Sequence, residues 1–199
     1  MIKIFYILDL EWMTWNRKSN FNPKLRKNWQ KKEIVQIGVC QYRIKKNNFV
    51  LNKKLNIYIK PKFNLQLPKY FMRLTGITQN VVDTRGLYFI DAMRSLKKFI
   101  LSKSFILTNG GDKNVLKYNC NLHNINSNSF LSCYKFINIR KIFKKFFKGK
   151  NLTTENLHNL FGFKKTKSHD AISDCITISK CFNLLNKKYD HKIQQTVFK

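Results

Sequence analysis

The apolar positions in the first third of the chain follow the patterns of β-strands. Residues 4–10 form a short apolar run that ends at two acids, which predicts a buried central strand. Residues 33–43 are rich in β-branched side chains and predict a second strand. Residues 55–59 alternate between apolar and polar positions up to Pro61, which predicts a third strand. Because the connections are short, we expect these strands to form an antiparallel meander.

After residue 86 the apolar positions take the spacing of helices. Phe89, Ala92, Met93 and Leu96 lie on one helical face and predict a helix over residues 87–101. A short apolar strand at 104–108 then leads into a Gly-Gly turn. The remaining pattern predicts helices at 112–121, 141–148, 154–161 and from His169 onward, with a fifth strand at 136–139. This order predicts one α/β domain, a mixed five-stranded sheet flanked by helices, over residues 1–188. A polar C-terminal tail, 189–199, is expected to fray.

Composition narrows the class of protein. No apolar run approaches the length of a membrane span, and the first residues lack the apolar stretch and cleavage site of a signal peptide. We therefore expect a cytoplasmic protein that does not enter a membrane. The formal net charge is +29, from 39 Lys and Arg against 10 Asp and Glu. Such a surface attracts nucleic acid. An A/T-rich genome would also enrich Lys at tolerant surface sites, so the charge alone does not decide between the two explanations.

Two acids end the first predicted strand. Asp9 and Glu11 are two residues apart, so their side chains project from the same face. Adjacent carboxylates repel each other unless a cation lies between them, and hard cations such as Mg²⁺ or Mn²⁺ take oxygen ligands. The alternative is a pair of solvated acids at the end of a strand.

Three further residues have a chemical interpretation. Asp174 lies on the apolar face of the last predicted helix, where an ionised carboxylate needs a partner or a metal. His169 precedes it by five residues, and an imidazole can accept a proton from water near neutral pH. Asp112 follows Gly-Gly at the start of a helix, which suits an N-cap as well as a ligand. Asp174 could instead pair with a Lys.

Together these residues resemble the DEDDh branch of the DnaQ-like 3′→5′ exonucleases, which have a ribonuclease H-like fold. The motifs that carry the resemblance are Asp9-Leu-Glu11, Asp112 after Thr-Asn-Gly-Gly, and His169 with Asp174 in His-Asp-Ala-Ile-Ser-Asp. Between them, Leu-Thr-Gly-Ile-Thr at 74–78 is similar to a segment usual in that family. The opening Leu-Asp-Leu-Glu and the 70–78 segment look closest to Eri1-like and KapD-like RNA exonucleases.

The resemblance implies a two-metal hydrolysis of single-stranded RNA or DNA 3′ ends, with RNA favoured, to nucleoside 5′-monophosphates. It implies two divalent cations, Mg²⁺ or Mn²⁺, held by Asp9, Glu11, Asp112 and Asp174, with His169 as the general base. It also implies that the terminal nucleotide contacts a set of residues near the first and Leu-Thr-Gly-Ile motifs: Leu10, Trp12, Met13, Leu74, Gly76 and Ile77.

Other functions remain open on the sequence. A proofreading or repair DNA exonuclease would have the same motifs, and a nucleic-acid-binding adaptor could keep the fold without turnover. All five site residues are present, which argues against the adaptor. A homodimer is compatible with the family, although no interface pattern indicates one.

Overall fold

A five-stranded sheet forms the centre of the protein in the computed structural model, which describes residues 4–15, 31–164 and 169–198. The strand order is β3-β2-β1-β4-β5. The strands are β1 (Ile4–Trp12), β2 (Ile34–Lys45), β3 (Asn48–Tyr58), β4 (Phe105–Thr108) and β5 (Lys135–Asn138). The first three strands are antiparallel neighbours, and β4 and β5 run parallel to β1. The predicted mixed α/β sheet is confirmed, and β1 lies at its centre.

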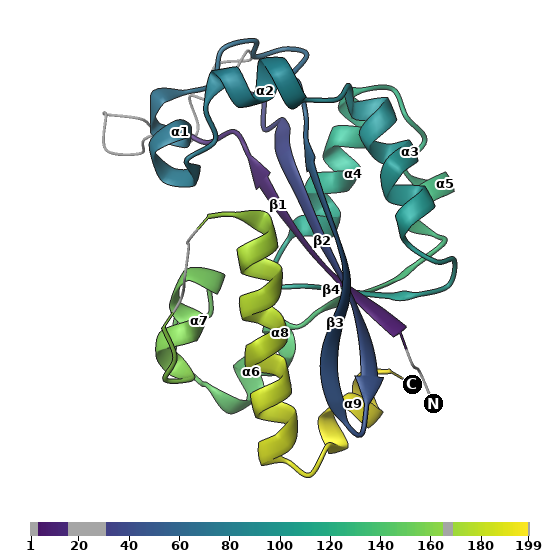
Figure 1. Cartoon of the computed structure of the whole chain (residues 1–199), viewed down its shortest axis with the longest axis vertical. Helices are drawn as coiled ribbons and strands as arrows, with labels where there is room; N and C mark the ends of the chain where they lie inside the picture. Colours follow the sequence, from purple (N-terminus) through teal and green to yellow (C-terminus); the bar gives the residue numbers. More distant parts are fainter. Residues whose placement is uncertain (1–3, 16–30, 165–168, 199) are drawn as a thin grey trace.

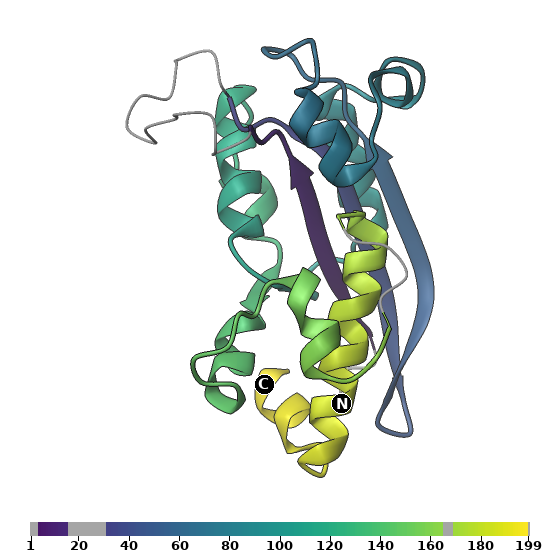
Figure 2. The same cartoon turned by 90° about the vertical axis from the view of Figure 1, so that its left-hand side faces the viewer.

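Helices cover both faces of the sheet (Figure 1). Those of the first half are α1 (Lys69–Thr75), α2 (Gln79–Arg85), α3 (Phe89–Phe99), α4 (Asp112–Leu122) and α5 (Asn128–Leu131). Those of the second half are α6 (Arg140–Phe146), α7 (Thr154–Leu160), α8 (Ala171–Lys188) and α9 (Lys192–Val197). Viewed from the side, α4 and α8 flank the strands (Figure 2), and α3 shares one core cluster with α4. Among the described residues, no helix is long and apolar enough to span a membrane.

The alternation of side chains along β1 divides the core in two. Tyr6, Leu8 and Leu10 pack in the cluster beneath α3 and α4. Phe5 and Ile7 point the other way and pack in the cluster beneath α8. The two-residue repeat therefore places Asp9 and Glu11 on the α8 side of the sheet.

Two parts of the fold differ from the sequence prediction. Strand β3 begins at Asn48 instead of residue 55, because it is an edge strand whose first half is exposed and polar. The C-terminal segment does not fray, which corrects our expectation for the polar tail. It forms α9, in which Ile193 and Gln194 are buried, and the Phe198 ring lies 5.0 Å from the Phe5 ring. Apolar residues within a polar segment were sufficient to dock it on the core.

Candidate active site

Strand β1 presents two carboxylates near its C-terminal end. Asp9 pairs with Gly38 and Glu11 with Gln36 of β2, and both acids are buried. A bulge between Glu11 and Trp12 ends the regular pairing. Such bulges change the direction of side chains next to sites. The strand register therefore fixes both carboxylates on the face that α8 covers.

The N-terminus of α8 is fixed against β2 by specific contacts. The Asp170 side chain caps the helix by accepting from the Ser173 N–H at 3.0 Å. Gln36 accepts from the Ala171 N–H at 3.2 Å and donates to Asp170 at 3.3 Å. Gly38 allows the helix to approach, because a Cβ atom there would lie 2.5 Å from the Ala171 carbonyl carbon. These contacts set the position of Asp174 in the first turn of the helix.

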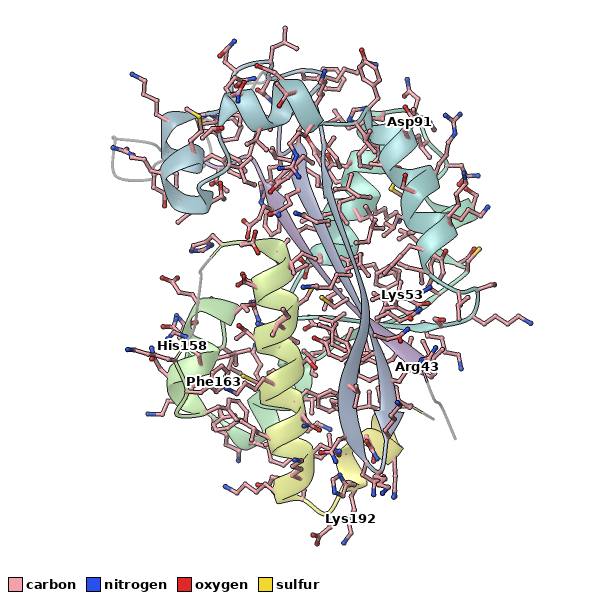
Figure 3. All side chains as sticks on the ribbon, viewed as in Figure 1. Arg43, Lys53, Asp91, His158, Phe163 and Lys192 are labelled. Atoms are coloured by element: carbon pink, nitrogen blue, oxygen red, sulfur yellow. The ribbon has the colours of Figure 1, made fainter. Side chains whose placement is uncertain are left out.

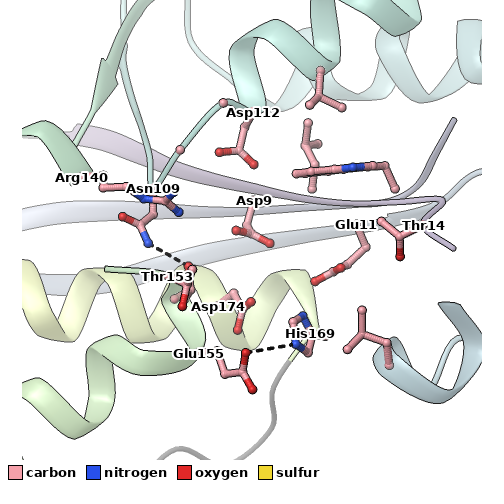
Figure 4. A pocket seen from close by; sticks show the side chains of 17 residues that line it. Asp9, Glu11, Thr14, Asn109, Asp112, Arg140, Thr153, Glu155, His169 and Asp174 are labelled. Carbon is pink, nitrogen blue, oxygen red and sulfur yellow. Dashed lines mark hydrogen bonds and ion pairs between the residues drawn. The ribbon is translucent and has the colours of Figure 1, made fainter. Parts of the chain in front are cut away.

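Asp9, Glu11 and Asp174 converge from β1 and α8 on one point (Figure 4). One ligand oxygen of each lies within 4.8 Å of the other two, and all three side chains are buried. Three negative charges at this spacing in a buried site favour a bound cation. The donor set is entirely carboxylate oxygen, which suits a hard divalent ion such as Mg²⁺ or Mn²⁺. The cluster therefore has the chemistry of a divalent-metal site.

Asp112 lies opposite this cluster at the start of α4 (Figure 4). It is the first helical residue, and the N-cap Gly111 has no side-chain cap, so the N-cap role considered for Asp112 is not observed. Burial raises the pKa of its carboxyl to about 6. The backbone N–H groups of Asp112 and Leu10 and the Arg140 guanidinium act in the opposite direction, and the Asp174 charge adds to the rise. A bound cation would favour the ionised form.

His169 stands at the rim, just before the α8 cap. Its backbone is left-handed, with φ of 53°, which is uncommon outside glycine and recurs at functional sites. Its Nε2 lies 3.7 Å from Oε2 of Glu155, at the start of α7 (Figure 4). The imidazole therefore lies beside the carboxylate cluster, and the Glu155 carboxylate lies next to it.

These residues line one cavity of about 450 Å³. Its lining contains all five residues that the motifs indicated: Asp9, Glu11, Asp112, His169 and Asp174. Residues separated by most of the chain therefore form one site, at the C-terminal end of the central strand.

A model of the RNase_T family, described as exonuclease, matches residues 7–182. The chain belongs to this exonuclease family. It is 34% identical over 99 residues to the 3′-5′ exoribonuclease 1 of Rattus norvegicus, a match that covers 46% of this chain. The match spans only 28% of that relative's length.

Solved exonuclease structures share this fold. The nuclease domain of 3′hExo, a DEDDh family member bound to rAMP, superposes with a TM-score of 0.77 at 21% identity. The superposition covers 94% of this chain and 92% of that domain. Escherichia coli exonuclease I, in a zinc-bound complex with single-stranded DNA, superposes with a TM-score of 0.73 at 15% identity. This superposition covers 98% of this chain and 43% of the exonuclease I chain.

The residues predicted to contact the terminal nucleotide divide into two groups within this exonuclease fold. Leu10, Trp12 and Leu74 line the cavity. Met13 and Ile77 are buried in a core cluster with Phe71 and do not line it. Gly76 caps α1 with φ of 73° and is exposed outside the lining. Direct contact with substrate therefore stays a prediction for the first group, while Met13 and Ile77 lie in the core, outside the lining.

Several polar residues of the exonuclease cavity were missed by the sequence analysis. They are Thr14, Asn109, Arg140, Thr153, Thr154 and Glu155. Asn109 connects two of these segments, because its amide donates to Thr154 Oγ1 and to the Leu152 carbonyl, both at 3.0 Å. Glu155 had one available signal: in a chain with only 10 acids, an acid at a helix start is conspicuous. Arg140 had none among 39 basic residues.

Proposed function

We propose that this protein is a divalent-metal-dependent 3′→5′ exonuclease that removes nucleoside 5′-monophosphates from single-stranded RNA. The observation that carries the proposal is the convergence of Asp9, Glu11 and Asp174 in one cavity with Asp112 and His169. Family membership supports the reaction class. The likeness to a rat 3′-5′ exoribonuclease supports RNA as the substrate.

The carboxylates and the imidazole have separate tasks in this proposal. Asp9, Glu11, Asp112 and Asp174 would hold two divalent cations, Mg²⁺ or Mn²⁺. Bound there, such cations would supply Lewis-acid stabilisation of the charge that develops on the phosphodiester. His169 accepts the proton of the attacking water, which an imidazole can do near neutral pH. Water attacks phosphorus as its proton passes to His169, the bond to the 3′ oxygen of the preceding nucleotide breaks, and that oxygen leaves as an alkoxide that takes up a proton from solvent water.

The apolar end of the cavity suits the terminal nucleoside. Trp12 and Leu74 offer an aromatic ring and an aliphatic side chain, against which any base can stack. This contact is insensitive to sequence, so we expect trimming of 3′ ends of every base composition.

DNA is the second candidate substrate, because the protein has the same fold as a nuclease solved with single-stranded DNA. The test is incubation with 5′-labelled RNA and DNA oligomers of one sequence, with Mg²⁺, Mn²⁺ or chelator. We expect a metal-dependent ladder that shortens from the 3′ end, faster on RNA. A faster DNA ladder would reverse the substrate assignment.

A matched pair of variants separates this site from contaminating nuclease. Asp174→Asn removes one charge inside the cavity, and Asp91→Asn makes the same change on the exposed start of α3. We expect cleavage to be lost only in Asp174→Asn. Binding without shortening by the wild-type protein in both metals would instead favour the adaptor.

A further inference from the structure

The two ends of the cavity differ in chemistry. Arg140 lies on one side of Asp9, and Glu11 and Thr14 lie on the other (Figure 4). Trp12 stands between Glu11 and Thr14 in the chain, and Leu74 comes from α1, which lies at that end of β1 (Figure 1). One end is therefore apolar and the other basic, with the carboxylates between them. Because the scissile phosphate must reach the carboxylates, the nucleosides on its two sides must point to opposite ends.

Arg140 is held at its end by the backbone around it. The Arg140 N–H donates to Asn138 Oδ1 at 3.1 Å, and the Ile139 N–H donates to the Thr108 carbonyl at 2.8 Å. These bonds join the start of α6 to the ends of β4 and β5. Gly110 makes room for the side chain, since a Cβ atom there would lie 3.2 Å from a terminal guanidinium nitrogen. The guanidinium thus lies directly beside the loop that leads into Asp112.

The Arg140 charge has no direct partner in the described part of the chain. No hydrogen bond or ion pair of its guanidinium occurs there, and its Nε is buried without an acceptor. Its effect on Asp112 is through space. Two divalent cations would balance the four carboxylates, so the Arg140 charge would then be available to a further anion. The planar fork of a guanidinium matches the oxygens of a phosphate.

Helix α6 extends this basic end away from the cavity. Its apolar face packs on the core through Phe143, which is fully buried. Its other side carries Lys141, Lys144 and Lys145, which are exposed, and Lys144 lies one turn beyond Arg140 on the same face. The sequence contains no Asp or Glu from residue 113 to residue 154, so no neighbouring acid along this segment offsets these charges.

We propose that Arg140 binds the phosphate immediately upstream of the scissile one, and that the phosphodiester backbone of the single strand then follows α6 past Lys144. We call this path, formed by Arg140 and Lys144, the α6 track. It rests on the proposed function, which places the scissile phosphate at the carboxylates. It assigns a direction to the substrate: the terminal nucleoside lies between Trp12 and Leu74, and the rest of the strand leaves over α6.

A chemical double-mutant cycle tests the Arg140 contact. The affinity of wild type and Arg140→Gln is measured for 5′-fluorescent RNA octamers in Ca²⁺, with one uncharged methylphosphonate linkage at each position in turn. The neutral linkage next to the scissile one should weaken wild-type binding about tenfold and add little to the loss in Arg140→Gln. If the losses of affinity from the neutral linkage and from Arg140→Gln add up at every position, Arg140 does not contact that phosphate and the proposal is overturned.

Exposed lysines test the rest of the track. Lys144→Gln should weaken octamer binding about threefold and reduce the salt dependence by one phosphate contact, a slope change of about 0.7. Lys53→Gln is the matched control, because Lys53 is exposed on β3, away from α6 (Figure 3). Equal losses of octamer affinity in Lys144→Gln and Lys53→Gln would refute the α6 track. They would show that the basic surface attracts the strand only through its overall charge. Thermal melts confirm that each variant is folded.

The design keeps the two proposals separable. Binding in Ca²⁺ does not require turnover, so a protein that fails to cleave can still confirm or refute the α6 track. In an active protein, Lys144→Gln should raise the KM for octamers and leave the cleavage of a dinucleotide, which has no upstream phosphate, unchanged. A loss of dinucleotide cleavage in Lys144→Gln would contradict the assigned path.

Discussion

Buried carboxylates have two opposite kinds of surroundings in this protein. One kind is found at Glu33, and the other at the cluster of Asp9, Glu11 and Asp174. Glu33 is 1% exposed and accepts backbone N–H bonds from Lys62, Phe63 and Asn64 at 2.6–3.1 Å. The Asn64 side-chain amide also donates to it, at 2.8 Å. Asp9, Glu11 and Asp174 are also buried, at 5–8% exposed, but their close neighbours include one another. Burial alone therefore does not indicate catalysis. A carboxylate surrounded by donors fixes a loop, while carboxylates that face each other are arranged for a cation.

The largest expected difference between the two groups is in activity. Asp9→Asn should lower the cleavage rate by at least about 10³-fold, since a ligand that stabilises transition-state charge is lost. Its melting temperature should stay equal or rise, because the variant relieves repulsion among like charges. Cleavage assays and thermal melts on the same preparation measure both. A strongly destabilised Asp9→Asn would give Asp9 the structural role that we assign to Glu33.

Glu33→Gln should show the reverse behaviour. The carboxamide offers one acceptor oxygen where the carboxylate offers two, and its NH₂ faces donors. We expect a loss of about 3 kcal/mol of unfolding free energy, and a melting temperature lower by roughly 10 °C. The rate per folded molecule should stay near that of wild type. A fully stable Glu33→Gln with low activity would invert the comparison.

Metal should stabilise the protein only through the carboxylates that face each other. At about 100 times its dissociation constant, Mn²⁺ adds about 2.7 kcal/mol to the unfolding free energy. We expect melting to shift upward with Mn²⁺ in wild type and in Glu33→Gln, and not in Asp174→Asn. An unchanged Mn²⁺ shift in Asp174→Asn would place the metal elsewhere.

The smallest expected effect is at the cavity wall. Leu74→Ala removes a side chain that lines the cavity and should raise the KM about fivefold, a cost of about 1 kcal/mol. Met13→Leu preserves the volume of a fully buried residue and should leave the KM unchanged. Steady-state kinetics on one RNA oligomer compare the two. A larger KM change in Met13→Leu would show that Met13 contributes directly to the substrate site.

The sequence was informative where the periodicity was strong. The buried β1 and β2 and the face of α3 follow from apolar spacing, and the two-residue repeat correctly placed Asp9 and Glu11 on one face. Helices α1 and α2 were missed, because each is only 7 residues long and depends on tertiary packing around Met13 and Val35.

The polar wall of the site could not be predicted in the same way. Arg140 and Asn109 reach the cavity only because β4 ends beside β1 and β5 ends beside β4, and no local pattern encodes that position. The assignment of Met13 and Ile77 to the substrate came from the motif, and the fold places both in the core, outside the cavity lining. Motifs identified which residues gather, and the fold decided which of them face the cavity.

The most direct test of the central claim is anomalous diffraction from crystals soaked with Mn²⁺ and a nucleoside 5′-monophosphate. The account predicts Mn²⁺ peaks bound by the oxygens of Asp9, Glu11 and Asp174, with the phosphate between them and Arg140. Mn²⁺ bound at other residues, with these three carboxylates free of metal at saturating concentration, would contradict it.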